Sequence, residues 1–134
     1  MKIKLKTNQN DECLEFCNVE RFSDGSGFSA TLVVRSRGFS AEVPFSFEIN
    51  PFDKFIVALE EMNHLLHGKA RLKPNYEEPF IELELDNLGH LRVRGEMIEY
   101  SHMPQSLKFE FETDQTCLKP FIHDLKMWQD IPST

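Results

Sequence analysis

The sequence predicts an α+β fold in which antiparallel β-sheets, about eight strands in all, pack with two amphipathic helices, the second at the C-terminus. Apolar and polar residues alternate over several segments of strand length, which is typical of half-buried strands. After residue 50 and again after residue 117 the apolar spacing changes to three or four residues, which indicates helices. The 134 residues have the length of one domain, 1–134, and their 40% hydrophobic content can supply its core.

The first four strands are separated by turn-forming residues. The stretch SDGSG at 23–27 contains glycines that tolerate positive φ angles, so the segments on either side are expected to form a hairpin. The clearest alternation runs from Phe39 to Ile49, and its apolar members should face one way. Pro44 has no N–H to donate, so this strand should be an edge strand or carry a bulge. The expected strands are 2–6, 13–22, 28–36, 39–49, 70–72, 79–85, 91–98 and 107–112.

The first helix is expected to begin at the sequence NPFD. Asn50 is a favourable N-cap, Pro51 suits the first helical position, and Asp53 would lie in the first turn, where the helix dipole favours an anion. Gly68 is placed to end the helix in the position after the C-cap. The apolar face comprises Phe52, Phe55, Ile56, Leu59, Met62 and Leu66.

One register satisfies both the hydrophobic and the charge pattern of segments 79–85 and 91–98. A shift by one residue would disrupt both patterns, so the register is strongly specified. The connecting loop then covers 86–90, with Gly89 supplying an unusual backbone angle. The expected pairs are Leu85–Leu91 and Leu83–Val93 on the buried face, and Glu84–Arg92 and Glu82–Arg94 on the solvent-facing side.

Pro120 determines where the C-terminal helix starts. A proline in a helix interior costs about 3 kcal/mol, so Pro120 should lie in the first turn and the cap at Thr116 or later. Asp114 and Thr116 then belong to a turn whose side chains bond free backbone amides. The apolar face comprises Leu118, Phe121, Ile122, Leu125 and Trp128. Four of these positions are offset by 66 residues from the first helix, which is compatible with a duplicated sheet-plus-helix unit but also with any two amphipathic helices.

Composition and charge disfavour several classes of partner and location. A net charge of −7 and a pI near 5.2 disfavour nucleic acid and anionic membranes, and they suit a basic protein partner. The first ten residues lack the apolar region of a signal peptide, and no apolar run approaches the roughly 20 residues that cross a bilayer. Cys13 and Cys17 would be about 13 Å apart in a strand, too far to form a disulfide. A reduced cytoplasmic protein is therefore expected.

Three groups of polar residues have the composition of chemical sites, and each has a structural explanation. Capping accounts for the polar residues of the sequence Asp-Gln-Thr-Cys at 114–117. A nucleophile there would need a base within hydrogen-bond reach, and the nearest one in sequence, His123, falls outside the apolar face of its helix and is expected to point to solvent. His64 and His67 lack further ligands at a zinc spacing and suit a helix C-terminus. The acid pairs at 82/84 and 110/112 follow from strand alternation. The sequence predicts no catalytic residue, metal site or cofactor.

The candidate partner-binding residues come from extending the register between 79–85 and 91–98 outward. The extension places Tyr76 opposite Tyr100 and Glu77 opposite Glu99. Like charges that face each other across two strands do not stabilise the fold. Tyrosine is enriched at binding hot spots, although a frayed, solvated hairpin end explains the same composition and a bulge at Gly95 would change the pairing. These residues are Tyr76, Glu77, Glu78, Glu99 and Tyr100.

Three stretches, FDKFIVALEEMNHLLHGKARL, IELELDNLGHLRVRG and LKFEFETDQTCLKPF, resemble the WapI-type bacterial immunity proteins. The matching features are a helix followed by a step of small residues, a hairpin around Gly89, and a closing strand with an Asp-Gln-Thr turn; residues 1–36 contribute nothing to the likeness. The resemblance implies a non-enzymatic cytoplasmic protein that binds and occludes a toxin domain. The alternatives are a structural or assembly subunit and, less favoured, a small enzyme that uses surface carboxylates.

Overall fold

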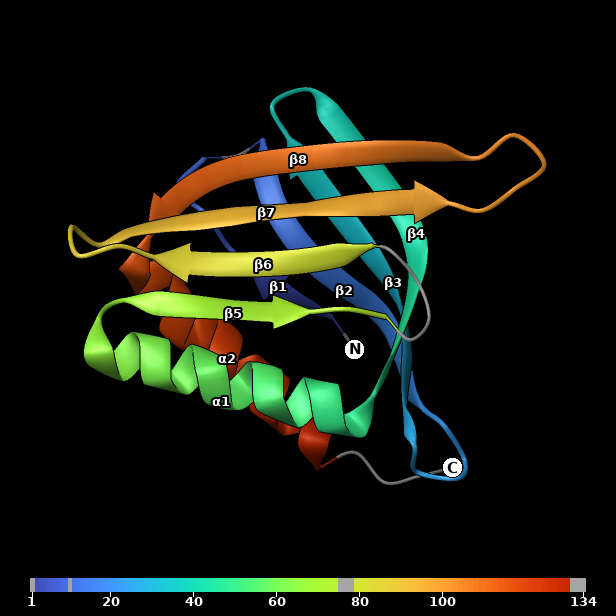
Figure 1. Cartoon of the computed structure of the whole chain (residues 1–134), viewed down its shortest axis with the longest axis horizontal. Helices are drawn as coiled ribbons and strands as arrows, with labels where there is room; N and C mark the ends of the chain where they lie inside the picture. The colour runs from blue at the N-terminus through green and yellow to red at the C-terminus, as the bar shows by residue number, and fades with distance from the viewer. Residues whose placement is uncertain (1, 10, 75–78, 131–134) are drawn as a thin grey trace.

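The computed structural model describes residues 2–9, 11–74 and 79–130, which form two four-stranded antiparallel sheets and two helices (Figure 1). The strand orders are β1-β2-β3-β4 and β5-β6-β7-β8, so strands adjacent in sequence are adjacent in space. The predicted α+β class is confirmed. The elements are β1 (Ile3–Leu5), β2 (Glu12–Arg21), β3 (Gly27–Ser36), β4 (Phe39–Glu48), α1 (Ile49–Leu65), β5 (Gly68–Leu72), β6 (Phe80–Leu85), β7 (His90–Glu99), β8 (Gln105–Asp114), the 3-10 turn η1 (Gln115–Cys117) and α2 (Leu118–Gln129).

The two sheets face each other, and the helices cover one side of the space between them. In Figure 1 the sheet β5–β8 lies in front of β1–β4, and its strands run across those behind. α1 packs along β5, and α2 packs against α1 and β1. β4 and β8 are the terminal strands of their sheets, as Pro44 predicts for β4. No helix of the described residues covers the side where these two edges approach each other.

An aromatic cluster joins α2 to both α1 and the first sheet. Trp128 is fully buried, and its ring lies 5.4 Å from that of Phe16 in an edge-on arrangement. It stacks on Phe28 and Phe47 at 6.2 and 6.4 Å and contacts Phe52 of α1 at 6.0 Å. Each such aromatic pair contributes about 0.5–1.5 kcal/mol beyond the burial of its area. The cluster therefore contributes substantially to the packing of the C-terminal helix against the rest of the fold.

The predicted register of β6 and β7 is confirmed in all four pairs. The structure corrects one detail, because Glu82 does not face solvent freely and is 5% exposed. Its Oε2 accepts hydrogen bonds from Nε and Nη2 of Arg94 at 3.0 and 2.8 Å, and Arg71 approaches it at 3.7 Å. Two guanidinium groups therefore cover the carboxylate and compensate for its loss of water.

The prediction that Asn50 caps α1 is wrong, because α1 begins at Ile49 and its N-cap is Glu48, whose side chain makes no capping bond. β4 runs straight into the helix, and the N–H of Ile49 donates to the carbonyl of Ser26 at 2.9 Å. A backbone acceptor from the β2–β3 turn thus replaces the side-chain cap. Asp53 consequently lies beyond the first turn, where it accepts a bond from Gln129 of α2 at 2.8 Å.

The C-terminal end of α1 also differs from the prediction. The C-cap is Leu66, which adopts the left-handed conformation with φ 62° and donates its N–H to the carbonyl of Met62 at 2.9 Å. Leu66 is therefore half-exposed and does not belong to the buried face, and Gly68 opens β5 with φ 136° instead of closing the helix. The helix therefore ends one residue earlier than predicted, and Gly68 is free to begin β5, which packs along α1.

Gly95 is required by the close approach of β6 to β7. A Cβ at this position would lie 2.2 Å from the carbonyl oxygen of Phe80 and 3.0 Å from the ring of Phe109. We expect Gly95→Ala to lower the free energy of unfolding by about 1–3 kcal/mol, as other overpacked cores do. Urea denaturation will measure the loss, with the exposed Ser46→Ala on β4 as control. Equal stability of the two variants would contradict a tight contact at Gly95.

Candidate functional site

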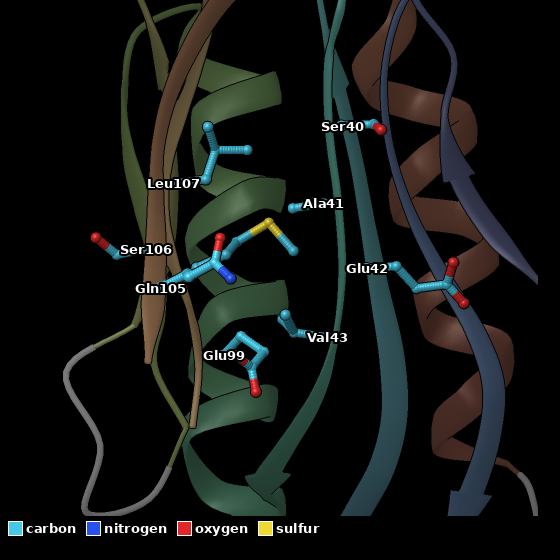
Figure 2. Close-up of a pocket in the computed structure, with 9 residues that line it drawn as sticks. Ser40, Ala41, Glu42, Val43, Glu99, Gln105, Ser106 and Leu107 are labelled. Atoms are coloured by element: carbon cyan, nitrogen blue, oxygen red, sulfur yellow. The ribbon is translucent and has the colours of Figure 1, made fainter. Parts of the chain in front are cut away.

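A groove runs between the free edge of β4 and the ends of β7 and β8 (Figure 2). Its cavity measures about 330 Å³. In Figure 2, Ala41 and Val43 point from β4 across the gap toward Gln105 and Leu107, whereas Ser40 and Glu42 point to the other face of β4. Met97 and Val43 are buried in its floor, and the lining residues are Ser40, Ala41, Glu42, Val43, Met97, Glu99, Gln105, Ser106 and Leu107.

A second hollow of about 300 Å³ continues the groove along β8 and shares Leu107 with it. Its wall includes Phe39, which is 68% exposed although strand alternation predicts it on the buried face. We call the two hollows together the β4–β8 groove. An exposed aromatic side chain beside partly exposed Ala41 and Leu107 gives this groove the apolar centre that protein interfaces require.

Of the five predicted partner-binding residues, one lines the groove and a second is its exposed neighbour in sequence. Glu99 ends β7 opposite Gln105, lines the first hollow, and accepts a hydrogen bond from the hydroxyl of Ser101 at 2.8 Å. Tyr100 follows it and is exposed. The other three lie outside the described residues: Tyr76, Glu77 and Glu78. Sequence reasoning missed the β4 wall, although Pro44 marks the free edge that forms it.

The outer face of β5–β8 carries charges that neutralise each other from strand to strand. Most of the basic residues lie on β5 and β7 and face acidic residues on β6 and β8, and one pair has the reverse order, with the acid on β7 and the base on β8. This arrangement gives the paired carboxylates of β6 and β8 structural partners. The ion pairs are Lys69–Glu84, Arg71–Glu82, Arg92–Glu84, Arg92–Glu110, Arg94–Glu82 and Lys108–Glu96, at 2.8–3.9 Å.

The polar sequence at 114–117 forms a capped turn. Asp114 is the N-cap of η1, and its Oδ1 accepts the backbone N–H of Thr116 at 2.8 Å and the Thr116 hydroxyl, while Asn8 donates to Oδ2. Thr116 therefore lies inside η1 as a donor, and α2 begins at Leu118 with Pro120 in its first turn, as predicted. Cys117 contacts the hydroxyl of Thr113 at 3.2 Å, and within the described residues no hydrogen bond or ion pair joins it to an imidazole.

These hydrogen bonds lower the pKa of Asp114, the Thr116 hydroxyl having the largest effect and Asn8 the next. We expect Asp114→Ala to cost about 1 kcal/mol of stability at neutral pH, the usual effect of losing a cap. Because the folded pKa lies below the ordinary 3.8, this stabilisation is present above that pH and is lost as the pH falls through the folded pKa. The difference from wild type should therefore shrink in acid, measured by thermal unfolding at several pH values.

Asp114→Asn is the matched control for this turn, because it keeps an oxygen that can accept the Thr116 N–H but cannot ionise. It should retain most of the cap at neutral pH. An Asp114→Ala penalty that stays constant from neutral to acid pH would contradict a stabilising role for the ionised carboxylate.

Among the described residues, no group of three or more His, Cys, Asp or Glu side chains is arranged to hold a metal ion. The helices of the same residues include none with the length and hydrophobicity needed to cross a membrane.

Comparison with known proteins gives one match. The family model described as the immunity protein WapI-like family matches residues 3–128, including the first strands, which carry no part of the resemblance seen in the sequence. No curated protein and no solved structure matches the chain. Because the match spans nearly the whole sequence, this chain belongs to the WapI-like immunity protein family.

Proposed function

We propose that this protein binds a cognate toxin domain in the cytoplasm and blocks it by occlusion, without catalysing a reaction. The observation that carries the proposal is the family match over residues 3–128. The net charge of −7 favours a basic toxin domain, because opposite net charges accelerate encounter and disfavour wrong partners.

The β4–β8 groove is the surface that we assign to the toxin. It combines an exposed phenylalanine, an apolar floor and a carboxylate at its mouth, Glu99, which matches the apolar core and polar rim of protein interfaces. Tyr100 and the predicted residues Tyr76, Glu77 and Glu78 are further candidates for contact with the toxin. The opposite side of the molecule is covered by α1 and α2, and the outer face of β5–β8 is internally neutralised.

Co-expression with the toxin domain encoded beside this protein tests the proposal. Growth should be restored, and the purified proteins should bind with submicromolar affinity that weakens at least several-fold as salt is raised and screens the charges. A catalytically inactive toxin variant serves as the control for nonspecific growth effects. Growth arrest despite abundant folded immunity protein would refute the proposal.

A further inference from the structure

A buried carboxylate lies at the start of β2. Glu12 is 5% exposed, and none of the described residues donates a hydrogen bond to its Oε2. The nearest cation is Arg37 in the β3–β4 turn, whose Nε is 3.5 Å away and whose side chain is 79% exposed. A carboxylate removed from water is costly unless donors replace the lost hydration. Arg37 at this distance supplies charge without a well-formed hydrogen bond.

The pocket in front of Glu12 measures about 510 Å³ and is acidic. Asp11 and Glu112 line it with Glu12 and Gln9, and among the described lining residues Arg37 is the one that is basic. This volume lies within the range of pockets that accept small ligands, so a single side chain can enter. The excess of carboxylates selects a cationic one.

The pocket adjoins the β4–β8 groove. Arg37 lines both the pocket and the second hollow of the groove, so a protein lying along the groove reaches Glu12 at its end. Arg37 is fixed through its backbone, with φ 50° and its N–H directed at the carbonyl of Asp11 at 3.3 Å. Its exposed side chain can therefore turn away without disturbing the turn.

We propose that Glu12 is a receptor for an arginine side chain of the partner protein. The guanidinium enters the acidic pocket and donates hydrogen bonds to the Glu12 carboxylate, while the Arg37 side chain moves into solvent. Arginine fits better than lysine because its planar guanidinium donates two parallel bonds to a carboxylate. Arg37 thus occupies, in the free protein, the position that the partner's cation takes in the complex. The identity of the partner as a toxin rests on the proposed function, whereas the cation pocket does not.

The pocket is tested by titrating the ¹⁵N-labelled full chain with N-acetyl-L-argininamide at low ionic strength. The amide signals of Glu12 and Arg37 should shift to saturation at millimolar probe, and uncharged N-acetyl-L-glutaminamide should not shift them. Glu12→Gln should weaken binding at least tenfold, and Arg37→Ala should tighten it about threefold because it removes the resident cation. The exposed Glu20→Gln is the control for a general loss of negative charge.

Each outcome decides the proposal. Absence of saturation in wild type, equal affinity of Glu12→Gln and wild type, or weaker binding by Arg37→Ala would overturn it, and Arg37→Ala gives this answer even if Glu12→Gln fails to fold. Tighter binding of free L-arginine than of the capped probe would overturn a protein side chain as the occupant. Toxin neutralisation unchanged in Glu12→Gln would overturn the inference and leave the proposed function intact. A protein that binds the probe but never neutralises the toxin would support the pocket and refute the proposed function.

Discussion

Trp128→Ala is expected to lower the free energy of unfolding by about 3–5 kcal/mol, the effect of removing a large, fully buried aromatic side chain. The indole is fully buried and contacts four phenylalanine rings, Phe16, Phe28, Phe47 and Phe52, which come from β2, β3, β4 and α1. Removing it leaves a cavity where α2 meets the rest of the core, and the surrounding strands can collapse into that cavity only in part. For a marginally stable domain such a loss removes a large share of the total stability.

Trp128→Phe is the matched control. It keeps an aromatic ring in the cluster and removes the Nε1–H, which is buried without an acceptor among the described residues. We therefore expect a clearly smaller loss than for alanine. Guanidinium denaturation followed by far-ultraviolet circular dichroism measures both variants, since each removes the single tryptophan. Equal losses of unfolding free energy in the two variants would show that packing of the aromatic ring is not how Trp128 stabilises the fold.

The register of β6 and β7 could be predicted because its information is local. Cross-strand pairs such as Glu84–Arg92 sit on either side of a short loop, so charge and hydrophobic patterns constrain the same alignment. The helical faces followed in the same way from spacing along one segment. Phe52 and Trp128 belong to the apolar faces of their helices, and such a face packs against the core of the protein, so their burial could be predicted from spacing alone.

Sequence reasoning failed where the deciding contact came from elsewhere in the chain. Asn50 has every local property of an N-cap. The carbonyl of Ser26, in a turn distant in sequence, nevertheless accepts the hydrogen bond of the Ile49 N–H, and the helix begins at Ile49. Phe39 and Phe45 occupy equivalent positions in the alternation of β4. Phe45 packs against Phe16 and Phe47 in the core, whereas Phe39 lies in the wall of the β4–β8 groove and is exposed.

The Glu12 pocket illustrates the same limit. In the sequence, Glu12 is an acid ahead of a strand, and no neighbouring residue indicates that it will be buried. Its burial arises because β3 pairs it with Ser36 and the following turn brings Arg37 over it. A site assembled by a hairpin from a different segment leaves no spacing pattern along the chain, so only the fold reveals it.

Leu107→Lys is expected to abolish protection against the toxin and to weaken binding about 100-fold or more, which is the effect of losing a central interface contact. Leu107 is shared by both hollows of the β4–β8 groove and is only partly buried. A lysine there fills the apolar centre and places a positive charge against a basic partner. Stability should change little, because the side chain does not belong to the buried core.

Val57→Lys on α1 makes the same chemical change at a half-exposed apolar residue on the helical side, and it should leave protection and affinity at the wild-type level. The comparison separates the groove from a general effect of added positive charge, because both variants change the net charge equally. Calorimetric titration with the purified toxin domain and growth under co-expression measure both. Loss of protection in Val57→Lys with full protection in Leu107→Lys would move the binding surface to the helices. The uncovered edges of β4 and β8 would then need another explanation.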